Sequence, residues 1–236
     1  MRPDCKMDSE VTVIRDGVKI LYEDNHIIVA IKPAGVLSQS DGSNSPDMLT
    51  ILKEYIKEKY SKPGEVYLGL VHRLDRPVSG LMVFARTSKA ASRLSEQIRN
   101  RKVEKIYRCI TEGVLEGSGR LENYISKDES KNIVTVSDKE KPGYKASYLD
   151  YKAIASKDGL TLVEVRLGTG RSHQIRAQMA HNGYPLIGDQ KYGKKDSRVK
   201  DIALEAYKLS FEHPVKREII TFEAPVPLDY PWSQFA

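Results

Sequence analysis

The residues best suited to catalysis lie in two short segments far apart in the chain. The first is His72-Arg-Leu-Asp75, followed at once by Arg76-Pro-Val-Ser-Gly80. The proline and the glycine favour a tight connection between rigid elements, and a carboxylate on such a loop can serve as a nucleophile. The alternative is structural, because Asp75 could also cap the turn or pair with Arg73 or Arg76.

The second segment is Leu167-Gly-Thr-Gly-Arg-Ser-His-Gln-Ile-Arg176. It predicts a strand end, a glycine turn and then a helix that Ser172 caps and that ends near Gly183. Backbone amides at the start of this helix, together with Arg171, would form an anion site for an RNA phosphate or a catalytic carboxylate. The glycine turn alone also fits a purely steric role before a helix.

The histidines of these segments do not form a metal-binding pattern. His173 and His181 have no acidic partner at the spacing of metal ligands, so we expect no metal ion. A metal-dependent phosphoesterase that uses His72, Asp75 and His173 is an alternative, and chelation would inactivate it. A kinase-like loop is a poor match, because Leu74 interrupts the His-Arg-Asp pattern.

Strands outnumber helices among the elements that must position these segments. Apolar residues at three-to-four spacing predict one helix over residues 48–60 and a second over residues 88–99, capped by Ser88. Apolar and alternating runs predict strands at residues 19–22, 26–32, 81–85, 105–111, 133–136, 146–151, 160–167, 206–211 and 218–222. Because strands and helices do not alternate regularly, we predict an α+β domain on a mixed, largely antiparallel sheet flanked by helices and loops. The polar stretch from Lys127 to Lys145 is expected to be a mobile surface connection.

Length and composition narrow the class of protein. With 236 residues the chain is near the upper end for one domain, so we expect a polar N-terminal extension over residues 1–18 and a single domain over residues 19–236. A formal net charge of +6 favours a polyanionic partner. Cys5 and Cys109 form no disulfide or zinc-binding pattern, which indicates a reducing compartment. No segment resembles a signal peptide or a membrane span, so we expect a cytoplasmic protein without membrane contact, by default a monomer with no obligatory protein partner.

Together with Lys105-Ile-Tyr107, the two segments resemble the RluA family of pseudouridine synthases, in which an His-Arg-Leu-Asp loop is followed by a Ser-Gly turn. The resemblance extends from about Lys19 to Trp232, and the matching pieces occur in the family's order. The further pieces are Leu21-Tyr-Glu-Asp24, Lys32-Pro-Ala-Gly35, Pro185-Leu-Ile-Gly-Asp189, Tyr192-Gly193, Phe211-Glu-His-Pro214 and Ala224-Pro225.

The resemblance implies a pseudouridine synthase fold with a central active-site cleft, and it assigns roles to individual residues. Asp75 would be the nucleophile, and Tyr107 the aromatic residue that packs on the uracil and can take its C5 proton. Arg176 resembles the arginine that pairs with the nucleophile and keeps it ionised.

Five residues are expected to contact the RNA substrate. They are His72, Arg73, Arg171, His173 and Gln174. Arg73 resembles the family arginine associated with displacing the target base. This role fits the chemistry, because a uridine stacked in RNA must be flipped out before it can enter a pocket.

The implied reaction converts uridine to pseudouridine in structured ribosomal or transfer RNA. It breaks the N1–C1′ bond and rejoins the uracil through C5 with no net oxidation and no transferred group, so it requires no cofactor. The carboxylate could add to ribose C1′ or to uracil C6, or assist a glycal intermediate. The alternative is a non-catalytic RNA-binding or ribosome-assembly factor on the same fold.

The chain departs from the family pattern at Val78, where threonine is common. Valine keeps the β-branched shape but loses the hydroxyl group and its hydrogen bonds. Because Asp75, Tyr107 and Arg176 are all present, we expect a compensated subfamily. Many relatives carry an S4-type RNA-binding domain, and the 18 residues before Lys19 are too few to encode one, so we expect the catalytic domain to select the substrate.

Overall fold

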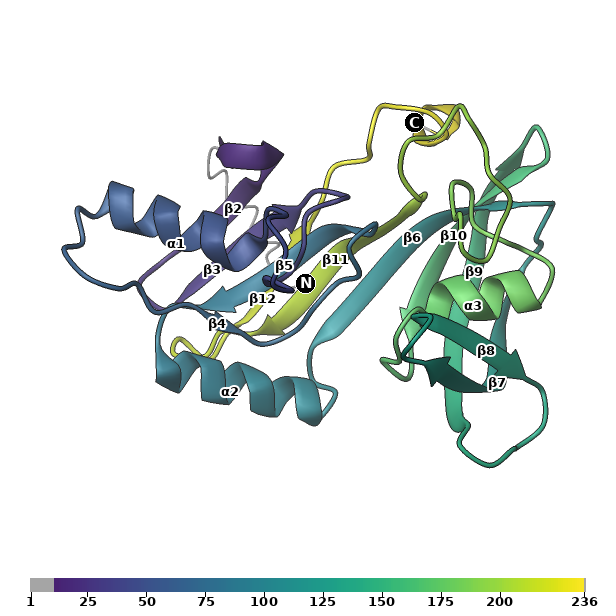
Figure 1. Ribbon diagram of the computed structural model, residues 1–236, viewed down its shortest axis with the longest axis horizontal. Coiled ribbons are helices and arrows are strands. Elements are labelled where there is room, and N and C mark those ends of the chain that lie inside the picture. Colours follow the sequence, from purple (N-terminus) through teal and green to yellow (C-terminus); the bar gives the residue numbers. More distant parts are fainter. Residues whose placement is uncertain (1–10, 236) are drawn as a thin grey trace, which may run out of the picture.

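A mixed β-sheet dominates the computed structural model, which describes residues 11–235 (Figure 1). Its strands are β1 (Thr12–Val13), β2 (Lys19–Glu23), β3 (Ile27–Lys32), β4 (Gly69–Leu70), β5 (Ser79–Ala85), β6 (Glu104–Glu112), β7 (Ser118–Asp128), β8 (Ile133–Ser137), β9 (Lys145–Lys157), β10 (Leu160–Leu167), β11 (Leu204–Glu212) and β12 (Ile219–Glu223). The helices are α1 (Met48–Lys59), α2 (Ser88–Arg99) and α3 (Gln174–His181), with 3₁₀ turns η1 (Arg15–Gly17) and η2 (Trp232–Gln234).

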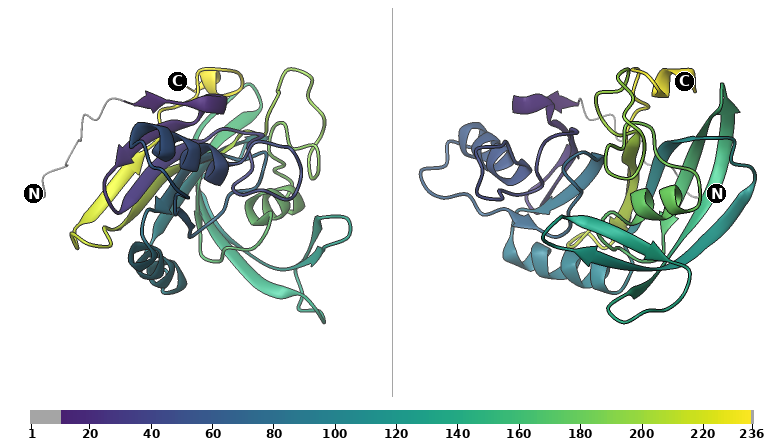
Figure 2. Two further views of the ribbon diagram at one scale, coloured as in Figure 1. Left: turned by 60° about the vertical axis from the view of Figure 1, so that its left-hand side comes forward. Right: turned by 45° about the vertical axis from the view of Figure 1, so that its right-hand side comes forward.

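The strands are hydrogen-bonded in the order β1-β2-β3-β5-β11-β6-β10-β9-β7-β8, with β4 beside β5 and β12 beside β11. Among the described strands only β5 and β11 pair in parallel, and the other pairs are antiparallel. The predicted α+β domain on a mixed, largely antiparallel sheet is therefore confirmed. Figures 1 and 2 show α1 and α2 beside the strands of one half of the sheet and α3 beside β7 and β8 in the other half. No helix within residues 11–235 has the length and apolar character needed to cross a membrane.

The strand β5, which follows the Asp75 loop, is buried on both faces. Side chains alternate along a strand, so Met82 and Phe84 join the core that packs against α1. Leu81 and Val83 point the other way and join the core that packs against α2. A strand with two buried faces has a continuous apolar run, which explains why this strand could be predicted.

The helices α1 and α2 each begin at a side chain that caps the first turn. Asp47 accepts a hydrogen bond from the backbone N–H of Thr50, and Thr87 accepts one from the N–H of Ala90. The second helix is therefore capped by Thr87, which corrects the expected Ser88 cap by one residue. Both arrangements satisfy an N–H group that has no partner within the helix.

Three stretches that the sequence did not assign to the sheet belong to it. Gly69–Leu70 pairs with β5. Thr12–Val13 pairs with β2, within the segment expected to be a polar extension. The strand β7 pairs with both β8 and β9. The stretch from Lys127 to Lys145 therefore contains the end of β7 and all of β8, which corrects its description as a mobile connection. The pattern of β7 was hard to read because a polar residue, Asn123, is buried in it and accepts a hydrogen bond from Gln178.

The helix after the glycine turn begins later than expected. α3 starts at Gln174, and the residue before it is His173, which has a left-handed φ of 51° and makes no side-chain cap. Ser172 therefore does not cap the helix, which corrects the prediction. The end of the helix agrees with the sequence, because Gly183 lies just beyond α3 with a φ of 87°.

Candidate active site

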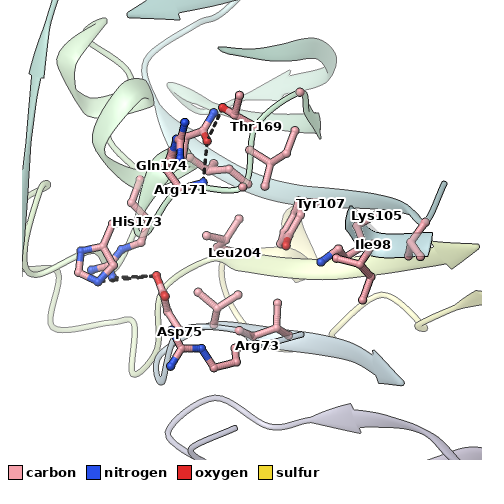
Figure 3. A pocket seen from close by; sticks show the side chains of 18 of the residues that line it. Arg73, Asp75, Ile98, Lys105, Tyr107, Thr169, Arg171, His173, Gln174 and Leu204 are labelled. Carbon is pink, nitrogen blue, oxygen red and sulfur yellow. Dashed lines mark hydrogen bonds and ion pairs between the residues drawn. The ribbon is translucent and has the colours of Figure 1, made fainter. Parts of the chain in front are cut away.

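A cavity of about 410 Å³ lies between the loop that carries Asp75 and the loop that carries Arg171 (Figure 3). The three residues to which the resemblance assigns chemistry, Asp75, Tyr107 and Arg176, all line this cavity. The expected substrate contacts that also line it are Arg73, Arg171, His173 and Gln174. The structure thus brings together residues from motifs that are far apart in the chain.

The loop that carries Asp75 is held on its N-terminal side by Ser38. The Oγ of Ser38 donates to the backbone carbonyl of Leu74 over 2.8 Å and accepts the N–H of Leu74 over 3.0 Å. Both residues are buried, so removal of the hydroxyl would leave two backbone groups without partners. One hydroxyl group therefore fixes the residue next to Asp75.

On its C-terminal side the loop is held by the turn Lys32-Pro-Ala-Gly35. Lys32 has no exposed surface, and its Nζ donates to three backbone carbonyls, including that of Arg76 over 3.1 Å. The N–H of Gly35 donates to the same carbonyl over 2.9 Å. Burial lowers the pKa of Lys32 to about 7, and the negative charge of Asp75 opposes this shift. The turn thus clamps the backbone directly after Asp75.

A glycine beyond the loop lets two strands approach closely. Gly80 has a φ of 131°, and a Cβ at this position would lie 2.5 Å from backbone atoms of Ala206. These residues pair where β5 and β11 run in parallel. A side chain here would push β11 away from β5, and Leu204 of β11 forms part of the cavity lining. The glycine therefore helps to set the dimensions of the cavity.

Arg176 contacts two aspartates on different edges of its guanidinium group. Its Nε and Nη2 donate to Asp189 over 2.8 and 2.7 Å, whereas its Nη1 lies 3.8 Å from Oδ2 of Asp75. The side chain of Asp189 is 0% exposed, and that of Asp75 is 31% exposed. The expected ion pair between Arg176 and Asp75 is therefore present, and a shorter bidentate pair with Asp189, which the motifs did not suggest, accompanies it.

Arg176 and Asp189 form an ion pair in a buried position, and both side chains keep their charges there. Burial by itself would lower the pKa of Arg176 and raise that of Asp189, but their mutual hydrogen bonds and charges reverse both shifts. Both groups therefore stay ionised at neutral pH. Arg176 presents a fixed positive charge to the neighbouring carboxylate of Asp75.

His173 contacts the same carboxylate. Its Nε2 lies 3.8 Å from Oδ2 of Asp75, and its Nδ1 shares a 2.7 Å hydrogen bond with the hydroxyl of Tyr192. Burial lowers the pKa of His173, and the charge of Asp75 opposes this shift. The imidazole is therefore neutral at neutral pH, so Arg176 supplies the positive charge next to Asp75.

Tyr107 forms an aromatic wall of the cavity (Figure 3). It comes from β6, where alternation places Lys105 and Tyr107 on the same face of the strand, and both line the cavity. Burial, and then the charge of Asp75, raise the pKa of Tyr107 well above its usual value. Its hydroxyl group is therefore protonated at neutral pH.

The side chain of Gln174 braces the glycine loop. Its Oε1 accepts hydrogen bonds from Oγ1 of Thr169 over 2.8 Å and from the N–H of Arg171 over 3.0 Å. Its Nε2 donates to the carbonyl of Tyr148 over 2.9 Å. Because its amide has these partners and the residue is buried, Gln174 holds the glycine loop, and its contact with substrate stays a prediction.

His72 does not belong to the cavity lining. Its Nε2 accepts the N–H of Val83 over 3.1 Å, and burial lowers the pKa of its ring well below the usual range. His72 therefore ties the Asp75 loop to β5, which corrects its expected contact with substrate. The set His72, Asp75 and His173 is not assembled as a metal site, and within residues 11–235 no three His, Cys, Asp or Glu side chains are grouped to hold a metal ion.

Several residues of this site received no role from the sequence. Among them are three charged residues, Lys32, Lys105 and Asp189. Each lies within a motif piece, but a short motif gives no information about the partner of a charged side chain. The sequence offered a sign of a structural role only for Lys32, because this residue ends the apolar run that forms β3 and so lies at the edge of the core.

Known proteins resemble this chain in sequence and in fold. A family model described as RNA pseudouridylate synthase matches residues 26–181. A Neisseria meningitidis protein named ribosomal large subunit pseudouridine synthase D is 36% identical over an alignment of 226 residues, which covers 90% of this chain and 59% of that protein. An uncharacterized RNA pseudouridine synthase of Bacillus subtilis is 36% identical over 214 residues, which cover 89% of this chain and 69% of that protein.

Solved structures support the same fold. The structure of human RNA pseudouridylate synthase domain containing 4 matches with a TM-score of 0.73 at 23% identity, over 88% of each chain. The present chain spans 59% of the length of the Neisseria meningitidis relative. The family match and the Bacillus subtilis relative confirm the resemblance read from the motifs, and the chain belongs to the RluA family of RNA pseudouridine synthases.

Proposed function

We propose that this protein isomerises uridine to pseudouridine in structured RNA, with Asp75 as its nucleophile. The observation that carries the proposal is that the only carboxylate in the described lining of the cavity shares that space with Tyr107 and Arg176. Relatives named ribosomal large subunit pseudouridine synthases make ribosomal RNA the first substrate to test, with transfer RNA as the second. We place this activity in the cytoplasm, without an obligatory protein partner.

Access of the uridine to Asp75 requires that the base leave the RNA stack. Base flipping costs a few kcal/mol, and a residue that fills the vacated space offsets part of this cost. Arg73 is exposed, borders the cavity and lies two residues before Asp75 in the same loop (Figure 3), so its side chain can fill the space that the base leaves. The basic side chains of the lining would attract the phosphate backbone and position it without reading its sequence.

The chemistry follows from the two groups that face the base. Asp75 assists cleavage of the N1–C1′ bond, the uracil turns, and C5 forms the new bond to C1′. The C5 proton must then leave, and N1 gains a proton, so the product is an isomer. Because Tyr107 is neutral, we propose that its oxygen accepts the C5 proton while its own hydroxyl proton passes to Asp75, which then releases that proton to solvent, and N1 takes up one proton from water. This relay requires no free phenolate.

The test replaces Asp75 by Asn and measures pseudouridine by mass spectrometry in unmodified ribosomal and transfer RNA. We expect turnover to fall by about 10³-fold or more, because loss of a nucleophile can cost up to about 10⁶-fold in kcat. RNA binding should persist. Asp158→Asn is the matched control, because Asp158 is an exposed turn residue with a left-handed φ that Asn also tolerates.

The same assay separates the alternatives. A non-catalytic RNA-binding factor would form no pseudouridine with the unmodified protein under any condition. A metal-dependent phosphoesterase would lose activity in EDTA, whereas the proposed isomerase should be unaffected. Turnover by the Asp75→Asn protein at a rate near that of the unmodified protein would overturn the assignment of the nucleophile.

A further inference from the structure

The end of the cavity away from His173 is lined by basic side chains that the proposed chemistry does not use. Lys105 lies on the other side of Tyr107 from His173 in Figure 3. Arg99 and Arg101, from the end of α2 and the turn after it, line the same cavity. We propose that Lys105, together with Arg99 and Arg101, binds a phosphodiester group of the RNA strand next to the flipped uridine. This inference rests on the proposed function for the identity of the RNA.

The three cations have no anionic partner within residues 11–235. Among the described residues, Arg99, Arg101 and Lys105 make no ion pair and no side-chain hydrogen bond. A neighbouring cation behaves differently, because Arg166 pairs with Glu104 over 2.8 Å. Cations that remain unpaired around a cavity attract an anionic ligand, and the phosphate group is the anion that every RNA strand supplies.

The surroundings of Lys105 strengthen this attraction. Its side chain is only partly exposed, and burial lowers the pKa of its amino group. The apolar side chains of Ile98 and Val103 also line the cavity. A charge near apolar groups interacts more strongly with an anion than a charge in water does. A phosphate at this position would offset the cost of keeping the ammonium ion partly buried.

The position of Lys105 relative to Tyr107 indicates that the bound phosphate adjoins the nucleotide whose base packs on Tyr107. Alternation on β6 separates the two side chains by one same-face step, roughly 7 Å along the strand. If the uracil packs on Tyr107, the ammonium group of Lys105 faces the adjoining part of the nucleotide chain. Lys105 is suited to this contact because its ammonium group is a compact charge with three donors. Arg99 and Arg101 would neutralise the strand as it enters the cavity.

The test is lysine acylation footprinting with a 12-nucleotide oligouridylate as the probe. It uses the Asp75→Asn protein so that the probe is not converted. Lys102 is the internal reference, because it is exposed on the turn that carries Arg101 but does not line the cavity. With the probe at about ten times its Kd, acylation of Lys105 should slow by about tenfold, because only about one site in eleven is free. Acylation of Lys102 should change little.

A salt titration of probe binding provides the second measurement. Lys105→Met should reduce the slope of log K against log salt by about 0.7, the value for one phosphate contact in a single strand. Lys105→Arg should restore the slope, and Lys102→Met should leave it unchanged. A probe with an uncharged methylphosphonate backbone should not protect Lys105.

The outcomes distinguish this inference from the proposed function. Equal protection of Lys102 and Lys105, or an unchanged salt slope in Lys105→Met, would overturn the phosphate site even if pseudouridine forms. Selective protection of Lys105 with the charged probe alone would support the site even if no pseudouridine forms. Neither measurement depends on catalytic turnover.

Discussion

Asp75 and Asp189 contact the same guanidinium group in opposite ways. Asp189 has no exposed surface, forms two short hydrogen bonds with Arg176 and accepts a third from the N–H of Lys191 over 2.9 Å. Asp75 is 31% exposed and lies 3.8 Å from the remaining nitrogen. One arginine therefore serves two purposes. Asp189 fixes the position of Arg176, and the positive charge of Arg176 stabilises the carboxylate of Asp75, whose oxygens stay accessible to a substrate.

If Asp189 has a structural role, its loss should affect stability far more than the loss of Asp75. We expect Asp189→Asn to lower the free energy of unfolding by about 3–5 kcal/mol, because removal of one partner leaves a buried charge unpaired. Asp75→Asn should change it by about 1 kcal/mol or less, because the pair is longer and partly exposed. Urea unfolding of the two variants measures both values.

Acid unfolding checks the origin of this difference. The pKa of Asp189 is lowered in the folded protein, although burial alone would raise it. Its stabilising effect is therefore complete above the unfolded value, near 3.8, and is lost as pH falls through the lower folded value. Below about pH 4 the free energy of unfolding of Asp189→Asn should therefore fall less steeply with decreasing pH than that of the unmodified protein. Similar destabilisation by the Asp75 and Asp189 variants would remove the distinction between the two aspartates.

A substitution of Tyr107 tests whether the cavity that it shares with Asp75 carries out proton transfer. Tyr107→Phe should lower single-turnover rates by about 10²-fold, the lower end of the range for a group that transfers a proton. RNA binding should persist, because the ring remains. The raised pKa of Tyr107 also means that its ionisation should produce no break in the rate profile at or below its usual value of 10.0. An unchanged rate in Tyr107→Phe would limit the residue to packing.

The sequence predicted the elements with one clear periodic signal. The strand β5 was predicted because both of its faces are apolar, and α1 was predicted because its apolar residues follow one face. The strand β7 was not predicted, because Asn123 is buried at a position where an apolar residue would normally stand. Its burial depends on Gln178 of α3, a partner that is distant in the sequence.

The site was predictable as a set of residues but not as a set of contacts. The motifs identified Asp75, Tyr107 and Arg176, which line one cavity. They gave no indication that the bidentate partner of Arg176 is Asp189, because that pairing depends on how the turn before Tyr192 folds back on α3. Sequence patterns record which residues are present, whereas the partner of a buried charge depends on tertiary structure.

Val78 is the residue at which the Asp75 loop departs from the family, and the structure indicates how the loop is held without a hydroxyl there. Its side chain is 3% exposed and belongs to the apolar core, while its backbone N–H donates to the carbonyl of Asp75 over 3.0 Å. The remaining support comes from Ser38 and Lys32, which bond to the backbone on either side of Asp75. None of these hydrogen bonds involves the side chain of residue 78.

Val78→Thr should therefore change the rate of pseudouridine formation less than Asp75→Asn or Tyr107→Phe does. Its hydroxyl would enter an apolar environment, which should cost about 1 kcal/mol of unfolding free energy. The rate of pseudouridine formation should change by less than about threefold, well under the 1.4 kcal/mol of a tenfold effect. Ser38→Ala is the comparison, because it removes hydrogen bonds on both sides of the Leu74 backbone and should slow the reaction more. A tenfold faster reaction in Val78→Thr would mean that the missing hydroxyl, and not the backbone clamps, limits the position of Asp75.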